Sequence, residues 1–195
     1  MKADFLNNET YKFLFSSMKY ENALIMRTCL ETGLRVGDVC ALPASALQGN
    51  TIRYIAQKTG KRGSAQISSD LASRLYKPGA VWLFPSPHNL AKHRTRQAVW
   101  RDVKLACARL GISEHVSPHS ARKTFAVDLY RKKGLTAVQN ALQHDRIDTT
   151  MIYAFSDVLG KKSTKNVENF VENINIEQLA ELIAQKVYEK MQGIS

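Results

Sequence analysis

The sequence is poor in acidic residues and in cysteine, and it contains no long apolar run. Its 195 residues include 17 Asp and Glu against 28 Lys and Arg, which gives a net charge of +11, while 44% of the residues are hydrophobic. No stretch approaches the roughly 18 consecutive apolar residues of a membrane-spanning helix, and the N-terminus lacks the apolar core of a secretory signal. The hydrophobic content is too high for a disordered chain. We therefore expect a basic globular protein of the cytoplasm that makes no contact with membranes.

The three cysteines are widely spaced. Cys29, Cys40 and Cys107 lie in apolar stretches, and their odd number does not suit a disulfide framework. The paired spacing that holds zinc is missing as well, so we expect buried thiols and no metal site. The excess positive charge raises the local concentration of anions, which favours nucleic acid as the partner. Charge alone indicates association and not what the association achieves.

The hydrophobic pattern predicts a mainly α fold with one small antiparallel β-sheet. A short helix is expected near Arg35, and alternating runs on either side of the turn at 58–61 predict a β-hairpin. The longer helix over 118–133 has clear ends, because Ser117 is a favourable cap, Pro118 suits a first turn and Gly134 stops the helix. The other expected helices cover 8–17, 21–31, 69–76, 94–110, 136–142, 149–155 and 175–191, and the strands cover 51–56 and 63–67.

Several side chains suited to phosphate chemistry are spread along the chain. Two guanidinium groups, those of Arg35 and Arg122, could hold the non-bridging oxygens of a phosphodiester, whose negative charge grows in the transition state. His119 and Arg122 are three residues apart and would share one helix face. Tyr153 could act as a nucleophile if cationic neighbours and a proton acceptor assisted it. Taken singly, each residue is also explained as an ordinary surface cation or half-buried aromatic.

Taken together, these residues resemble the catalytic domain of the tyrosine recombinases, also called the phage integrase family. The resemblance covers residues 5–160 and rests on the order of four segments. These are TGLRVGDVCAL around Arg35, the hairpin turn with Lys58, PHSARKTFA with His119 and Arg122, and LQHDRIDTTMIYA with His144 and Tyr153. Gln143 stands where the family usually has glycine, and Ala121 and Lys123 replace the usual leucine and histidine. None of these departures removes a catalytic group.

The resemblance implies a reaction without metal or ATP and without any other cofactor. Tyr153 would attack the scissile phosphate and form a 3′-phosphotyrosine, while Arg35 and Arg122 would clamp the non-bridging oxygens. Lys58 would protonate the leaving 5′ oxygen. His119 would assist proton transfer from Tyr153, and His144 would hydrogen-bond the phosphate. A partner strand's 5′-hydroxyl would then attack the phosphotyrosine, so that strands are exchanged.

Further residues are given smaller roles. Asp38, one turn beyond Arg35, is placed to orient that arginine, although a carboxylate at the start of a helix would look the same. Contacts with DNA are expected from four basic residues, Lys61, Arg94, Arg96 and Lys123.

The resemblance also implies a domain organisation and partners. We expect the catalytic domain in residues 1–160, followed by a linker and C-terminal helix in 161–195 that docks on a neighbouring subunit. The separate N-terminal core-binding domain of most members is expected to be absent, so the chain is either an excised domain or a minimal recombinase. The implied partners are double-stranded DNA, further copies of the chain in a tetramer, and DNA-bending or directionality proteins.

The first hypothesis is therefore a site-specific DNA recombinase, an integrase or invertase of a prophage or mobile element. A second is a DNA-binding regulator that keeps the fold without recombination, although binding alone has no need of Tyr153. A third is DNA relaxation of the type IB topoisomerase kind. The products distinguish them, since heterologous duplexes would be joined, DNA would stay unaltered, or circles would be relaxed.

Overall fold

The computed structural model describes residue 6 and residues 8–113 and 115–142. The chain divides into two compact units after Arg146, and all described residues belong to the first unit. The helices expected over 149–155 and 175–191, and the domain boundary expected at 160, lie outside the described residues.

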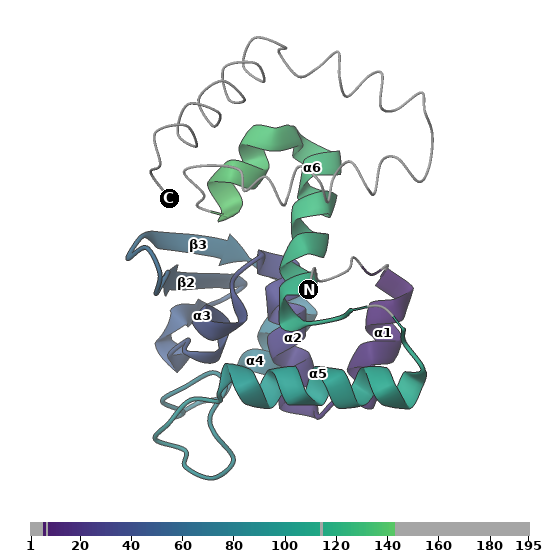
Figure 1. The fold of residues 1–195 in the computed structure, drawn as a ribbon. Coiled ribbons are helices and arrows are strands. Elements are labelled where there is room, and N and C mark those ends of the chain that lie inside the picture. Colours follow the sequence, from purple (N-terminus) through teal and green to yellow (C-terminus); the bar gives the residue numbers. More distant parts are fainter. Residues whose placement is uncertain (1–5, 7, 114, 143–195) are drawn as a thin grey trace, which may run out of the picture. The chain divides into compact units, whose positions relative to one another are not determined.

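The described residues form a mainly helical fold with one small sheet, as the sequence predicts (Figure 1). No helix among them is long and apolar enough to cross a membrane. The helices are α1 (Asn8–Ser17), α2 (Tyr20–Thr32), α3 (Val36–Cys40), α4 (Ser69–Leu75), α5 (Arg96–Leu110) and α6 (Pro118–Leu142), with a 3₁₀ turn at Ala44–Ala46. The strands are β1 (Leu47–Gln48), β2 (Thr51–Ile55) and β3 (Arg62–Gln66).

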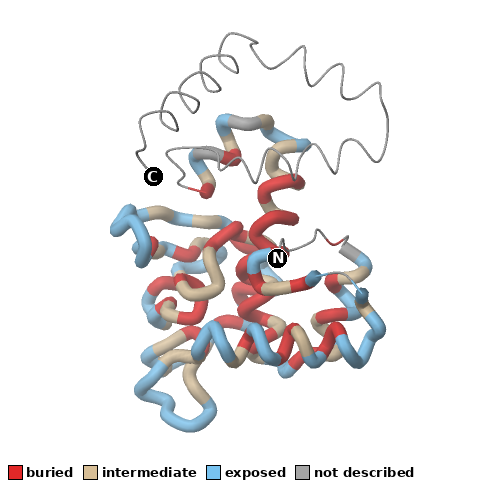
Figure 2. Tube along the Cα trace, viewed as in Figure 1, coloured by how far each residue is buried: buried red, intermediate tan, exposed pale blue. Residues whose placement is uncertain are grey.

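The core is built around α2, which packs against α3, α4, α5 and α6. Buried residues run along α2 and the first part of α6, whereas the hairpin turn and the loop before α5 are exposed (Figure 2). Leu24, Ile25, Met26 and Cys29 all lie inside the core, at positions that no single helix stripe would contain. Because α2 is covered on several sides, its residues set where the surrounding helices lie.

The sheet is antiparallel, in the order β1-β2-β3. Tyr54 lies opposite Gly63, and Ile52 lies opposite Ala65. Ile52 is fully buried and Tyr54 is half-buried, so these two face the core, while Arg53 and Ile55 are exposed on the other face. This alternation is the period of two expected of a sheet with one solvated face. The two predicted strands are confirmed, with a short third strand added before them.

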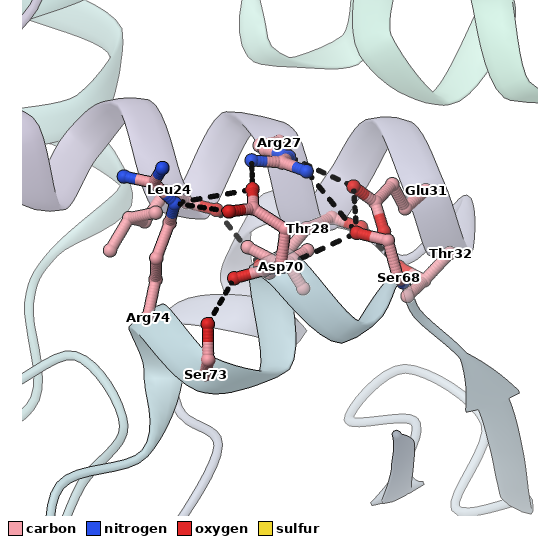
Figure 3. A network of polar contacts seen from close by, with 10 residues as sticks. Leu24, Arg27, Thr28, Glu31, Thr32, Ser68, Asp70, Ser73 and Arg74 are labelled. Atoms are coloured by element: carbon pink, nitrogen blue, oxygen red, sulfur yellow. Dashed lines mark hydrogen bonds and ion pairs between the residues drawn. The ribbon is translucent and has the colours of Figure 1, made fainter.

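The connection between α2 and α4 is fixed by ion pairs (Figure 3). Arg27 of α2 donates to Asp70 at 2.6 Å and to Glu31 at 2.9 Å. The Ser68 hydroxyl caps α4 by accepting from the Leu71 N–H, and the Ser68 N–H donates to Glu31 at 2.8 Å. These contacts hold the chain that follows β3 against α2.

Two arms joined at Gly134 make up α6. Gly134 has φ 75° and ψ −174°, a conformation open in practice to glycine alone, so the first arm ends where the sequence predicts. The second arm then turns away and finishes at Leu142 (Figure 1). Because of this bend, Leu142 at the end of α6 lies close enough to Arg122 for its carbonyl to accept a hydrogen bond.

Candidate active site

Two arginines from opposite parts of the fold meet near the C-terminal end of α2. Arg35 stands at the N-cap position of α3, two residues beyond the glycine that ends α2. Arg122 comes from the first arm of α6 and is only 4% exposed. Its Nη1 donates to the Gly33 carbonyl at 2.6 Å, and its Nη2 donates to the Leu142 carbonyl at 3.1 Å. The packing of α6 on α2 therefore brings the two predicted phosphate clamps together.

The electrostatics of Arg122 reflect this crowding. Burial, reinforced by the positive charge of Arg35, lowers the pKa of Arg122 to about 10, while the Asp38 carboxylate acts in the opposite direction. At neutral pH the guanidinium is still protonated. The two hydrogen-bond acceptors given above are neutral carbonyls, so they fix the geometry of Arg122 without cancelling its charge. A buried cation held in this way is suited to binding an anion.

Asp38 links the arginine pair to the hairpin. It is 6% exposed, and its Oδ1 accepts a 3.0 Å hydrogen bond from the backbone N–H of Gln57. Gln57 directly precedes Lys58, whose side chain is exposed in the turn between β2 and β3. Asp38 thus acts on Arg122 electrostatically and holds the backbone next to Lys58 at the same time.

Of the three remaining predicted catalytic residues, the structure describes only His119. His119 is exposed on the first turn of α6, three residues before Arg122. His144 and Tyr153 lie outside the described residues. The structure therefore brings together Arg35, Asp38, Arg122 and the turn that carries Lys58, and the roles of the histidines and of Tyr153 stay predictions.

The four predicted DNA contacts differ in exposure, and their role in binding DNA stays a prediction. Lys61 and Arg96 are exposed. Lys123 is only 8% exposed. Arg94 donates from Nη1 to the Asn22 side chain at 3.2 Å, and its Nε is buried with no hydrogen-bond partner among the described residues. Lys123 is therefore buried on α6, whereas Arg94 is half-buried in the loop before α5 and bonded to α2 through Asn22.

The three cysteines are buried free thiols, as predicted. Burial raises the pKa of Cys40 to about 12 and raises that of Cys29 further. These thiols are therefore protonated and unreactive at neutral pH. No group of three or more His, Cys, Asp or Glu residues that could hold a metal ion occurs within residues 6, 8–113 and 115–142.

Sequence reasoning missed the partners of Arg122. The Gly33 carbonyl is 89 positions away and the Leu142 carbonyl 20 positions away. Phe125 also approaches Gly33, and Tyr54 lies close enough to Arg122 to influence its pKa. Tyr54 could have been found from the period of two along β2, which turns it to the face of Ile52. The two carbonyl contacts could not have been found in this way, because a pattern of side chains does not indicate which backbone carbonyls lie near Arg122.

Residues 4–158 match the phage integrase family. The chain belongs to the phage integrase family. Among curated members, the integrase of Escherichia phage P2 is 28% identical over 151 residues, which cover 77% of this chain and 42% of that protein. The tyrosine recombinase XerD of Rhizobium meliloti is 36% identical over 134 residues, which cover 63% of this chain and 43% of that protein. This integrase-family chain thus spans less than half the length of these relatives.

Solved structures show the same fold for this integrase-family chain. The catalytic domain of bacteriophage HP1 integrase aligns with a TM-score of 0.61 at 22% identity, covering 90% of this chain and 98% of that one. A lambda integrase tetramer bound to a Holliday junction aligns with a TM-score of 0.62 at 18% identity, covering 79% of this chain and 48% of that one. The predicted family and fold class are both confirmed.

Proposed function

We propose that this integrase-family chain carries out site-specific DNA recombination, cleaving and rejoining DNA through a 3′-phosphotyrosine on Tyr153. The observation that carries the proposal is the pairing of Arg35 with the buried Arg122 beside the turn of Lys58. Two neighbouring guanidinium groups, one of them oriented by two backbone carbonyls, can stabilise the charge that develops on a phosphate. A protein that only occupied DNA would have no use for a buried cation of this kind.

The proposed reaction conserves bonds at each step. The Tyr153 oxygen attacks phosphorus, and the bond from phosphorus to the 5′ oxygen breaks. Lys58 supplies the proton for that oxygen, and the tyrosine proton leaves with the help of His119. Arg35, Arg122 and His144 hold the non-bridging oxygens. The 5′-hydroxyl of a partner strand then attacks the phosphotyrosine, which releases the tyrosine and joins the new strand without ATP or metal.

The proposal includes the partners of the reaction. Double-stranded DNA is the substrate, and strand exchange requires further copies of the chain, which we propose to form a tetramer on DNA. A lambda integrase of the same fold has been solved as a tetramer on a Holliday junction, which supports this arrangement. Residues 161–195 would supply the linker and exchanged helix, and a chain truncated before Gly160 is expected to lose the tetramer. DNA-bending or directionality proteins would act as accessories.

Capture of covalent protein–DNA adducts tests the chemistry. The chain is incubated with nicked fragments of its host genome, denatured, and the attached DNA is sequenced. Tyr153→Phe is expected to abolish the adduct, whereas Tyr76→Phe, a matched change at a tyrosine that is 71% exposed, should leave it unchanged. Adducts that persist in Tyr153→Phe would refute the assignment of the nucleophile.

The role of Lys58 has its own test. A 5′-bridging phosphorothioate has a leaving group that needs little protonation, so it should restore cleavage to Lys58→Ala if Lys58 is the general acid. Lys12→Ala, a change at an exposed lysine of α1, serves as the control. Failure of the sulfur substrate to rescue Lys58→Ala would overturn this role. Joined duplexes, relaxed circles or unaltered DNA then separate recombination, topoisomerase activity and simple binding.

A further inference from the structure

The guanidinium of Arg122 donates hydrogen bonds to two backbone carbonyls. Its Nη1 and Nη2 reach the carbonyls of Gly33 and Leu142 at 2.6 and 3.1 Å, so the group is held from both sides. A planar fork with two such bonds has little freedom to rotate.

Gly33 is held unusually tightly for a residue that ends a helix. Its φ is +70°, in the left-handed region, and its N–H donates to the Cys29 carbonyl at 2.9 Å. A Cβ added to Gly33 would lie 2.3 and 2.6 Å from ring carbons of Phe125, and 3.0 Å from a methyl of Leu142. Phe125 lies on α6 three residues beyond Arg122 and on the same side of that helix. The ring therefore rests directly on the backbone of Gly33.

We propose that Gly33, Phe125 and Leu142 form a socket that positions Arg122 for the scissile phosphate. The absence of a side chain at Gly33 lets the Phe125 ring close on the turn, and this contact sets how near α6 lies to the Gly33 carbonyl. None of the three residues touches the phosphate, so they are positioning residues. The inference rests on the proposed function for its role in cleavage, but the socket itself can be tested without DNA.

A simpler explanation is that Gly33 serves only to end α2. The chain contains a matched control for that explanation in Gly111. Gly111 also ends a helix, α5, with φ +64°, and a Cβ there would meet nothing within 4 Å. Gly33→Ala and Gly111→Ala therefore introduce the same backbone strain, about that of any alanine in the left-handed region. Only Gly33→Ala adds a collision beside Arg122.

The first experiment measures the socket directly on the folded full chain. Phenylglyoxal, an arginine-selective dicarbonyl, is applied without DNA, and the rate of modification at Arg122 is followed by mass spectrometry. We expect Gly33→Ala to raise this rate about fivefold or more and Gly111→Ala to change it less than about twofold. Equal effects of the two variants on the rate of modification at Arg122 would contradict the proposed socket, whether or not the protein cleaves DNA.

The second experiment measures adduct formation in a double-mutant cycle. Gly33→Ala should slow the adduct on the order of tenfold to a hundredfold, since a shift of about 1 Å in a positioning group costs this much. In a Phe125→Ala background, where the ring is gone, the same change should cost no more than about threefold. Additive losses would show that Gly33 and Phe125 do not act together, and would contradict the proposal.

A change of substrate separates positioning from general damage. Replacing one non-bridging oxygen of the scissile phosphate by methyl removes its negative charge and reduces the need for a clamping arginine. The defect of Gly33→Ala should therefore shrink at least about fivefold on this methylphosphonate, and that of Gly111→Ala should not change. An equal defect on both substrates would refute a role through Arg122. If the unaltered chain forms no adduct at all, the proposed function fails, while the phenylglyoxal result still decides the socket.

Discussion

The carboxylate of Asp38 accepts a 3.0 Å hydrogen bond from the backbone N–H of Gln57, which joins the start of α3 to the turn between β2 and β3. Through this bond one buried residue is connected both to the arginine pair and to the backbone that carries Lys58. The two halves of the proposed chemistry, charge stabilisation and protonation of the leaving group, thereby share a single support.

Two substitutions of Asp38 should separate the effect of its negative charge from the effect of its hydrogen bond to Gln57. Asp38→Asn keeps an oxygen that can accept from Gln57, whereas Asp38→Ala loses it and leaves a part-buried N–H unsatisfied. We expect Asp38→Ala to lower the free energy of unfolding by about 1–3 kcal/mol more than Glu9→Ala, a control at an exposed carboxylate of α1. Urea unfolding measures the stability and adduct formation measures activity. Indistinguishable behaviour of Asp38→Ala and Asp38→Asn would show that the bond to Gln57 is unimportant.

Arg122 should tolerate no other cation. A lysine ammonium is a point charge without the planar fork, so Arg122→Lys cannot bond both carbonyls and present donors to a phosphate at once. We expect a loss of roughly 10²-fold or more in the rate of adduct formation, the cost of one preorganised donor in an active site. Arg74→Lys, on the exposed surface of α4, is the control and should remain active. A near-normal rate for Arg122→Lys would refute the clamping role.

Stability should fall at alkaline pH because of Cys40. Burial raises the pKa of this thiol from 9.0 to about 12 in the folded protein. Between these values the unfolded chain has lost the proton that the folded chain keeps, so the free energy of unfolding declines with rising pH, by about 1.4 kcal/mol per pH unit for one group. Comparing urea unfolding at pH 8 and pH 10, the wild type should lose about 1.4 kcal/mol more than Cys40→Ala. The same loss in both proteins would show that Cys40 does not contribute.

Arg94 and Arg96 should differ in their effects on DNA binding. The guanidinium of Arg94 bonds Asn22, whose own Nδ2 donates to the buried Asp102 at 2.7 Å, while Arg96 is exposed. Arg96→Ala should reduce the slope of log affinity against log salt by about 0.9, the value of one phosphate contact. Arg94→Ala should leave that slope nearly unchanged and lower the free energy of unfolding by about 1 kcal/mol. A salt slope altered equally by both changes would show that Arg94 contacts phosphate as Arg96 does.

Local chemistry explains why much of the fold could be predicted. Pro118 and Gly134 mark the first arm of α6 through their own backbone preferences, and both predicted limits are observed. Gly33 ends α2 in the left-handed conformation, again as expected from its lack of a side chain. Alternation of apolar and polar residues likewise located β2 and β3. In each case the deciding interaction lies within a few residues of the position itself.

The parts that escaped prediction depend on contacts between distant segments. Arg122 was identified from its spacing to His119, but its carbonyl acceptors became visible only when α6 was placed against α2. Lys123 and Arg94 were predicted to contact DNA. The burial of Lys123 on α6 and the bond from Arg94 to Asn22 depend on how distant helices pack, which a pattern of basic residues does not indicate. The sequence therefore indicated candidate residues for the site but not the backbone contacts that hold Arg122 in place.

The two carbonyl bonds of Arg122 also impose an order on the maturation of the protein. Its partners precede it by 89 positions and follow it by 20, so the arginine is seated only after the C-terminal arm of α6 has been synthesised and has bent back at Gly134. A nascent or truncated chain that ends before Leu142 already carries most of the basic residues. It lacks one of the two carbonyls that Arg122 bonds. In such a chain the Nη2 of Arg122 has no Leu142 carbonyl to bond, so only the bond to Gly33 orients the guanidinium.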